Sequence, residues 1–117
     1  MIIDCHVHMI TAKGYADKLV DTLDQAGIDK CCLLAMRQQD IWGSQTGYNN
    51  YVIEAYHKYP DRFIPFASVD LGVDPINMID NLQLEGFKGI KVTRTKYNYN
   101  DDIMMPYYER AARYNMV

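Results

Sequence analysis

Two histidines near the amino terminus are the residues in this sequence best suited to bind a metal ion. His6 and His8 lie two positions apart in the segment Ile3-Asp-Cys-His-Val-His8. Side chains alternate between the faces of a β-strand, so an extended segment would place Asp4 beside both histidines and Cys5 on the opposite face. Two imidazoles spaced in this way can bind one divalent cation. The alternative is a pair of partly exposed histidines on an edge strand, because metal sites usually have three or four protein ligands.

Lys91 is a second candidate for site chemistry. In the segment Gly86-Phe-Lys-Gly-Ile-Lys-Val92, strand alternation directs Lys91 away from Ile90 and Val92. If those apolar residues face covering helices, Lys91 faces the other side of the sheet. There it can bridge a metal after carboxylation by carbon dioxide, bind a substrate anion, or neutralise a carboxylate such as Asp4. The sequence leaves these three roles open.

The third histidine and the cysteines are expected to be structural. His57 lies in a helix-like segment beside a lysine and is expected at the surface. Cys5, Cys31 and Cys32 all lie in expected strands with apolar neighbours, which raise the pKa of a thiol and make it a poor nucleophile, so we expect them in the core. An odd number of cysteines with no CxxC motif also argues against a disulfide framework.

Four β-rich apolar segments alternate with helix-like segments, which is typical of repeated βα units and a parallel sheet. Gly and Pro residues and capping side chains mark the boundaries between these segments. The pattern predicts an α/β fold in a single domain spanning residues 1–117. The expected strands cover 2–9, 30–36, 62–69 and 87–93, and the expected helices cover 15–26, 49–59, 74–85 and 101–114.

The loops that follow the second and fourth strands are long and carry aromatic and basic residues. In parallel α/β folds the functional loops leave the carboxyl ends of the strands. Trp42 lies in the first of these loops, and Arg94 and Tyr97 lie in the second. We therefore expect these three residues at the rim of a pocket, the alternative being simple packing of the loops on their neighbours.

Composition narrows the range of partners. The net charge is −3, from 12 basic and 15 acidic residues, which offers no basic patch for a nucleic acid. The longest uninterrupted apolar run, residues 31–36, is far too short to cross a bilayer. The sequence also lacks a phosphate-binding glycine loop and a nucleophilic serine elbow. These observations favour a cytoplasmic protein that acts on a small-molecule substrate.

Four segments together resemble the amidohydrolase superfamily, in particular its amidohydrolase-2 branch, which also contains decarboxylases. The first segment alone is weak evidence, because TatD-type nucleases and PHP-type phosphoesterases open similarly. The third and fourth segments distinguish this branch from them. The matching segments are Ile3-Asp-Cys-His-Val-His8, Leu23-Asp-Gln-Ala-Gly-Ile-Asp29, Tyr59-Pro-Asp-Arg-Phe-Ile-Pro-Phe-Ala-Ser-Val-Asp70 and Gly86-Phe-Lys-Gly-Ile-Lys-Val92.

The resemblance implies a TIM-like (β/α) barrel of eight units and about 250 residues, of which this chain supplies four units. It implies that His6 and His8 bind a divalent metal, zinc first, with manganese or iron as alternatives. The expected reaction is hydrolysis of a C–N or C–O bond by a metal-activated water, or nonoxidative decarboxylation.

The resemblance also places the third metal ligand and the general base beyond the carboxyl terminus of this chain. Residues 104–117 look like the fourth helix running into the start of a fifth strand. We therefore expect the isolated chain to bind metal weakly and to have little hydrolase activity. The alternative is a non-catalytic half-barrel that assembles, with a second copy or another chain, through its open sheet edges.

Overall fold

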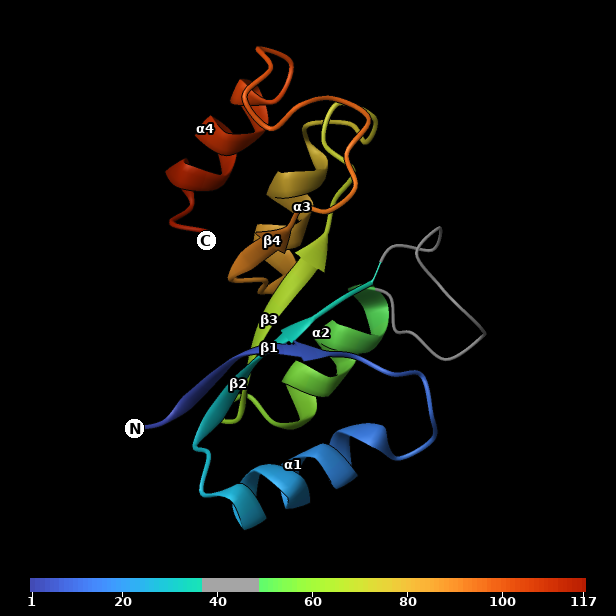
Figure 1. The fold of residues 1–117 in the computed structure, drawn as a ribbon, viewed down its shortest axis with the longest axis vertical. Coiled ribbons are helices and arrows are strands. Elements are labelled where there is room, and N and C mark those ends of the chain that lie inside the picture. Colours follow the sequence, from blue (N-terminus) through green and yellow to red (C-terminus); the bar gives the residue numbers. More distant parts are fainter. Residues whose placement is uncertain (37–48) are drawn as a thin grey trace.

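The computed structural model describes residues 1–36 and 49–117, which form four successive βα units (Figure 1). The strands make one parallel sheet in the order β1-β2-β3-β4. Every strand and helix expected from the sequence is present, which confirms the α/β fold. The elements are β1 (Ile3–His8), α1 (Tyr15–Ala26), β2 (Lys30–Leu34), α2 (Asn49–Lys58), β3 (Phe63–Ser68), α3 (Met78–Glu85), β4 (Gly89–Lys91) and α4 (Met105–Arg113).

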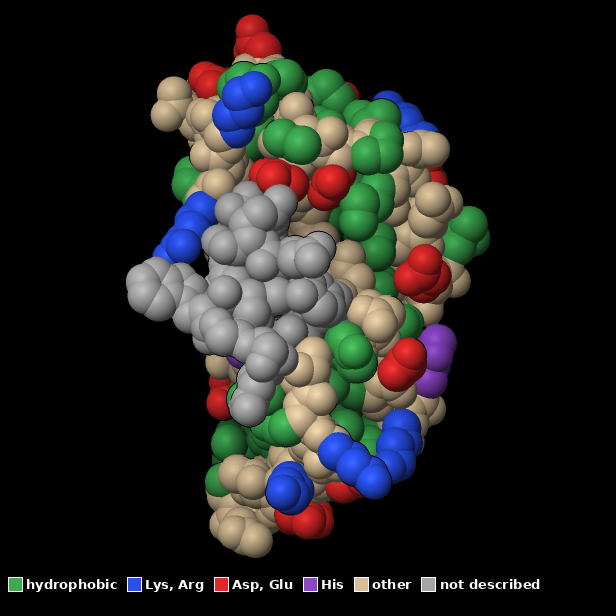
Figure 2. Space-filling model, turned by 90° about the vertical axis from the view of Figure 1, so that its right-hand side faces the viewer, with side chains coloured by type: hydrophobic (Ala, Val, Ile, Leu, Met, Phe, Trp, Pro, Cys, Tyr) green, Lys and Arg blue, Asp and Glu red, His purple; other side chains and the backbone are tan. Residues whose placement is uncertain are grey.

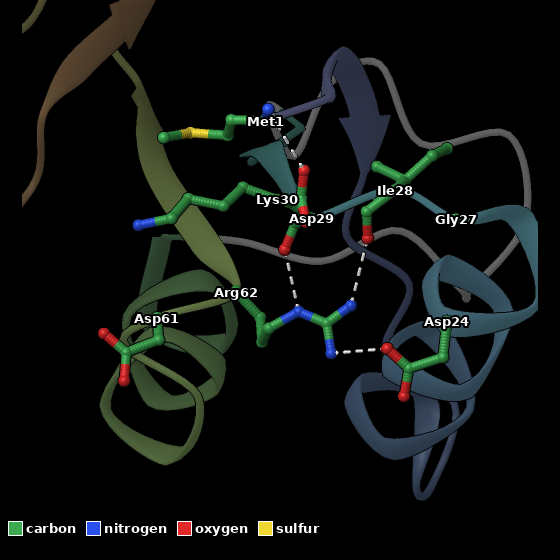
Figure 3. A pocket seen from close by; sticks show the side chains of 8 residues that line it. All are labelled: Met1, Asp24, Gly27, Ile28, Asp29, Lys30, Asp61 and Arg62. Carbon is green, nitrogen blue, oxygen red and sulfur yellow. Dashed lines mark hydrogen bonds and ion pairs between the residues drawn. The ribbon is translucent and has the colours of Figure 1, made fainter.

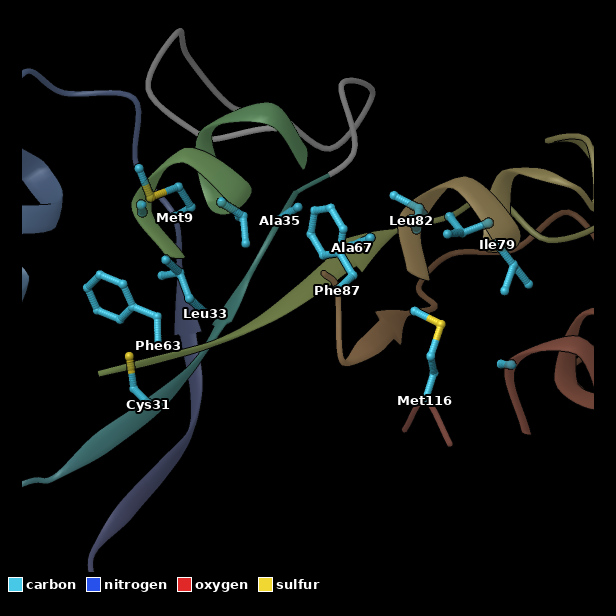
Figure 4. Packing of buried hydrophobic residues seen from close by; sticks show 14 of the residues in the cluster. Met9, Cys31, Leu33, Ala35, Phe63, Ala67, Ile79, Leu82, Phe87 and Met116 are labelled. Carbon is cyan, nitrogen blue, oxygen red and sulfur yellow. The ribbon is translucent and has the colours of Figure 1, made fainter. Parts of the chain in front are cut away.

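The helices pack on one face of the sheet because that face is apolar. Burial alternates along β3, where Phe63, Pro65 and Ala67 are buried and the intervening residues are partly exposed. Figure 4 shows side chains of this layer beside those of the helices. A consecutive strand order with helices on one face is the arrangement of a (β/α) barrel. The helix residues in the core are Leu19, Leu23, Val52, Ala55, Ile79, Leu82, Tyr107 and Ala111.

Arg62 holds the units together at the amino-terminal end of the sheet (Figure 3). Its guanidinium donates hydrogen bonds to the carbonyl oxygens of Asp29 at 2.8 Å and Ile28 at 3.1 Å. It also pairs with the Asp24 carboxylate at 2.7 Å. These three partners lie at the end of α1 and in the turn to β2, beside a hollow of about 700 Å³. The side chain therefore ties the first βα unit to β3.

The chain's last residue pairs with the outer edge of β4. The Val117 N–H donates to the Lys88 carbonyl at 3.0 Å, and the Val117 carbonyl accepts from the Ile90 N–H at 2.8 Å. This is the hydrogen-bond pattern of a parallel ladder, with Val117 opposite Gly89. The expectation that α4 leads into the start of a fifth strand is confirmed.

A register shift in β1 corrects the expected alternation around the histidines. Asp4 pairs with Cys31 and Val7 pairs with Leu33, so two residues of β1 lie opposite the single residue Cys32. Such a bulge breaks the period of two. The Asp4 carboxylate accepts a hydrogen bond from the His6 N–H at 2.9 Å, which stabilises the irregular backbone.

The bulge also changes the position of one cysteine. Cys31 is fully buried as expected, and Cys32 is partly buried, but Cys5 is exposed. The expectation that all three cysteines lie in the core is therefore wrong for Cys5. The bulge removes Cys5 from the alternation that would have directed it beneath the helices. His57 is exposed on α2, as expected.

Two helices begin later than their capping sequences suggested. The segment after β3 first forms turns, in which the Asp70 carbonyl accepts from Val73 and Asp74 N–H groups, and α3 begins only at Met78. Before α4, the Asp101 carbonyl accepts from the Met104 N–H, so residues 101–104 form a turn that precedes the helix. The aspartates start these turns without opening the helices directly.

Gly89 allows an aromatic ring to lie across β4. Phe66 pairs with Gly89 in the parallel register. A Cβ atom on Gly89 would lie 2.2 Å from a carbon of the Phe66 ring, which is closer than atoms can approach. The absence of a side chain at position 89 is therefore required by the packing of Phe66.

We predict that Gly89→Ala lowers the free energy of unfolding by about 1–3 kcal/mol, because the added methyl group displaces the Phe66 ring. Urea denaturation measures this change. The same substitution in a Phe66→Leu background should cost less, because the ring is absent. An equal cost in both backgrounds would contradict the packing explanation.

Asp80 joins α3 to α4. Its carboxylate accepts two hydrogen bonds from Arg110, at 2.7 and 2.5 Å, and one from the Tyr114 hydroxyl at 2.7 Å. The bonds from Arg110, followed by that from Tyr114, hold the pKa of the Asp80 carboxyl below its ordinary value. The ionised carboxylate is therefore the form that stabilises this helix pair.

The lowered pKa of Asp80 predicts a pH-dependent contribution to stability. The contribution should be complete above the ordinary aspartate pKa of about 3.9, and should be lost as the pH falls through the lower folded-state pKa. The difference in unfolding free energy between the unmodified chain and Asp80→Asn should therefore be largest near neutral pH and shrink in acid. Asp102→Asn, at an exposed position, is the control. A difference that stays constant between neutral and acidic pH would show that ionisation of Asp80 is unimportant.

Candidate metal centre

Two imidazoles and an ammonium group converge on the face of the sheet opposite the helices. His6 Nε2 and His8 Nε2 lie 2.9 Å apart. Lys91 Nζ lies 2.7 Å from His8 Nε2 and 3.1 Å from Met36 Sδ. The structure therefore brings together His6, His8 and Lys91, which the sequence had singled out separately.

The parallel register explains how Lys91 reaches His8 from three strands away. His8 is level with Leu34, Leu34 with Phe66, and Phe66 with Gly89. Lys91 lies two residues beyond Gly89 and therefore projects from the same face of β4, closer to the carboxyl edge. Three strand spacings amount to about 14 Å in a flat sheet, so the contact requires two long side chains and a curved sheet.

The positions of the imidazole nitrogens fit a shared metal ion. Zinc–nitrogen bonds are about 2.0–2.1 Å long, so two nitrogens on one ion lie about 2.9 Å apart at a right angle and about 3.4 Å apart at the tetrahedral angle usual for zinc. His6 Nε2 and His8 Nε2 lie 2.9 Å apart, which is the right-angle spacing, so a tetrahedral zinc would require the two rings to separate by a few tenths of an ångström. The donor chemistry also fits, because imidazole suits zinc and iron among other divalent ions.

His8 is held in the protonation state that binds metals. Partial burial, followed by the positive charge of Lys91 and then by His6, lowers the pKa of the His8 imidazole below 6.5. The neutral imidazole, which carries the metal-binding lone pair, is therefore favoured at neutral pH. His8 in its neutral form and the neighbouring His6 supply two imidazole nitrogens, which is an incomplete ligand set.

The two histidines have no further amino-acid ligand of the usual kinds nearby in residues 1–36 and 49–117. Within those ranges, no group of three or more His, Cys, Asp or Glu side chains is arranged to hold a metal. A catalytic zinc site generally uses three protein ligands and a water. The described residues thus supply part of a centre.

Several residues that position this cluster were not singled out from the sequence. The Tyr15 hydroxyl donates to the His8 carbonyl at 3.0 Å, which fixes the end of β1 against the start of α1. The Asn49 side chain bonds both the Ser68 carbonyl, at 3.1 Å, and the Ser68 N–H, at 2.7 Å. Asn49 therefore links α2 to the end of β3. Met36 could have been found as the last residue of the apolar run that ends the second strand.

The expected rim residues are only partly assembled in the described structure. Arg94 and Tyr97 line a hollow of about 580 Å³ that does not include the histidines or Lys91. Arg94 is exposed and has a backbone φ of 49°. The Tyr97 ring packs over Gly72, so it supports the loop after β4. Trp42 lies outside the described residues.

The buried cysteine is chemically quiet, as the sequence suggested. Burial, with a smaller contribution from Asp4, raises the pKa of the Cys31 thiol to about 12. Burial also raises the pKa of Cys32. The Cys31 thiol is therefore neither a thiolate ligand nor a nucleophile at neutral pH.

No family model and no curated protein sequence matches this chain. Solved structures do match it. One is a probable 2-pyrone-4,6-dicarboxylic acid hydrolase from Acinetobacter baumannii with citric acid bound, with a TM-score of 0.73 and 19% identity over 98% of this chain and 47% of that chain. This chain therefore spans about half the length of that enzyme.

Two further structures of the same kind are similar. An amidohydrolase II matches with a TM-score of 0.65 and 16% identity, over 97% of this chain and 48% of that one. A 5-carboxyvanillate decarboxylase from Novosphingobium aromaticivorans, with manganese and 3-methoxy-4-hydroxy-5-nitrobenzoic acid bound, matches with a TM-score of 0.64 and 23% identity, over 85% of this chain and 32% of that one. These neighbours are TIM-barrel amidohydrolases.

The chain has the fold of half such a barrel. At these identities the likeness establishes the shared fold. It confirms the expected TIM-like architecture, in which four of about eight βα units are present. In this half-barrel the histidine pair lies at the carboxyl end of β1, the edge of a barrel sheet where reactive groups are found.

Proposed function

We propose that this half-barrel supplies the first two metal ligands, His6 and His8, of a metal-dependent hydrolase of the amidohydrolase-2 type. The observation that carries this proposal is the 2.9 Å separation of the two Nε2 atoms at the carboxyl end of β1. The fold of the hydrolase and amidohydrolase neighbours supports it. Zinc is the first candidate, with manganese or iron as alternatives, and manganese is bound in the decarboxylase neighbour.

In such an enzyme a bound divalent ion supplies a water of lowered pKa and polarises the bond to be broken, here a C–N or C–O bond. The residues of this chain hold and orient the site. His6 and His8 present their Nε2 atoms close together, and the Tyr15 hydroxyl fixes the backbone of His8. Lys91 places a positive charge beside His8. The general base is assigned to no residue of residues 1–117.

Nonoxidative decarboxylation is the second candidate reaction. A decarboxylase of an aromatic acid is among the structural neighbours. Lys91, at the end of β4, offers a cation beside the histidine pair, and Arg94 lies in the loop that follows β4. A cation in either position can bind the carboxylate of a substrate.

The partner is proposed to be a small organic molecule in the cytoplasm. The face in Figure 2 carries acidic and basic side chains interspersed among hydrophobic ones, and neither charge dominates. This mixture supports neither nucleic acid nor anionic membrane as a partner. In the described ranges, no helix has the length and apolar character needed to span a membrane.

We further propose that residues 1–117 form the amino-terminal part of one (β/α)8 barrel domain. Val117 pairs with β4 opposite Gly89, which supports this proposal. The match to about half the length of the hydrolase supports it as well. The alternative is a half-barrel that assembles through its sheet edges, with a second copy as the simplest partner. Size-exclusion chromatography with light scattering distinguishes them, because a discrete dimer favours assembly and a monomer favours the single-domain proposal.

Metal binding tests the histidine pair directly. We predict that zinc binds the purified chain at one site in calorimetry, and that His6→Ala and His8→Ala each weaken binding at least about tenfold, because each removes one of two protein ligands. His57→Ala, on the exposed surface of α2, is the matched control and should bind zinc normally.

The same titration separates metal binding from catalysis. Because two protein ligands are fewer than a catalytic zinc site uses, we expect weak binding and little turnover of ester or amide substrates by this chain. Equal zinc affinity in the unmodified chain and in both histidine variants would refute the metal proposal. Tight stoichiometric binding with rapid turnover would instead refute the view that the site is incomplete.

Lys91 has a predicted effect on the metal that depends on its role. Its ammonium group competes for the His8 lone pair and repels a cation, so Lys91→Met should tighten zinc binding several-fold in buffer free of carbon dioxide. If Lys91 bridges metals as a carbamate, added bicarbonate should tighten binding by the unmodified chain but not by Lys91→Met. Unchanged affinity in Lys91→Met under both conditions would show that Lys91 does not act on the metal.

A further inference from the structure

The β1 bulge places two cysteines side by side on the face of the sheet opposite the helices. Cys32 lies between Cys31 and Leu33, which pair with Asp4 and Val7 of β1. The residues of β1 opposite Cys32 are therefore the bulged pair Cys5 and His6. The register therefore sets Cys5 beside Cys32 across the two strands, and Cys5 contributes to the raised pKa of the Cys32 thiol.

The third cysteine is excluded from this pair by strand alternation. Cys31 is 0% exposed and belongs to the core beneath the helices. Cys32, the next residue of β2, points to the opposite face and is only partly buried. Cys5 is exposed. The pair therefore combines one solvent-accessible thiol with one sheltered thiol.

The spacing suits a covalent bond. Neighbouring strands lie about 4.7–4.9 Å apart, within the range of about 4.4–6.8 Å that separates the Cα atoms of disulfide-bonded cysteines. The bulge loosens the local backbone of β1, because its extra residue is not paired in the ladder. A small adjustment of the bulge can therefore bring the two sulfurs to bonding distance without disturbing the core.

We propose that Cys5 and Cys32 form a peroxide-sensitive dithiol that closes to a cross-strand disulfide. Hydrogen peroxide oxidises the exposed Cys5 thiol to a sulfenic acid and is reduced to water. The Cys32 sulfur then attacks the Cys5 sulfur, an S–S bond forms, the S–O bond breaks and a second water leaves. Two thiols and one peroxide thus give one disulfide and two waters.

The disulfide would connect the bulge directly to β2, next to His6. The proposal does not depend on metal binding or on any catalytic role of the chain, since it concerns only the two thiols and their neighbours. The oxidation site lies at the bulge, on the face of the sheet opposite the helices, where the two thiols are next to the histidines.

Alkylation after oxidation tests this pairing. The reduced, folded chain is treated with peroxide, unfolded in denaturant and alkylated, and its intact mass is measured. We expect a monomer that has lost two hydrogen atoms and takes up one alkyl group, at Cys31, where the untreated chain takes up three. Adding reductant before alkylation should restore all three.

Variants identify the bonded pair. Cys5→Ser and Cys32→Ser should abolish the loss of hydrogen, whereas Cys31→Ala should retain it, and circular dichroism checks that each variant is folded. Peroxide treatment of the unmodified chain in denaturant should lose the preference for this pair. Three contrary results overturn the proposal, namely unchanged alkylation, a bond that requires Cys31, and a bond between two copies of the chain. Oxygen addition at Cys5 without a bond also overturns it.

Discussion

The hydrogen-bond register of the parallel sheet is the constraint on which the other features depend. It sets His8, Leu34, Phe66 and Gly89 at one level across four strands. Apart from the β1 bulge, the register is strongly specified, because a shift of one residue along a strand would turn its buried face toward solvent. Burial of the helix-facing side chains thus fixes how far along each strand the residues of the opposite face lie.

The two faces of the sheet carry different kinds of side chain. Beneath the helices, apolar side chains such as Leu33, Phe63 and Ala67 form a continuous core. On the other face, His8 Nε2 lies within 3 Å of both His6 Nε2 and Lys91 Nζ. These nitrogens are hydrogen-bond partners of one another, so the polar groups on this face satisfy part of their hydrogen bonding within the cluster.

Much of the fold could be predicted from local sequence. Apolar runs, Gly27 and Gly86 at helix ends, and Pro residues near boundaries reflect interactions between near neighbours, and the elements they mark agree with the structure to within a few residues. The late start of α3 has a local origin of another kind, because Asp70 and Asp74 bond to each other's backbone in turns. Such competition between a turn and a helix is invisible to capping rules.

The candidate site was only partly predictable. His6, His8 and Lys91 were recognisable from residue type and strand position, but their distances depend on the register and curvature of the sheet. The β1 bulge could not be foreseen, because alternation around Asp4 and His6 is compatible with a regular strand. For the same reason the exposure of Cys5 was not anticipated. Asn49 bonds to Ser68, 19 residues away, and no local sequence pattern predicts that contact.

The contacts of the Arg62 guanidinium have a consequence for how the sequence of this fold can vary. Its guanidinium binds two main-chain carbonyls, at Ile28 and Asp29, and only one side chain, at Asp24. Main-chain carbonyls are present whatever residue occupies those positions, so these hydrogen bonds tolerate substitutions in the turn before β2. At the amino-terminal end of the sheet, two of the three partners of Arg62 are therefore main-chain atoms that a change of side chain does not remove. The opposite edge, with its histidines and long loops, is left free to acquire new side chains without loss of the scaffold.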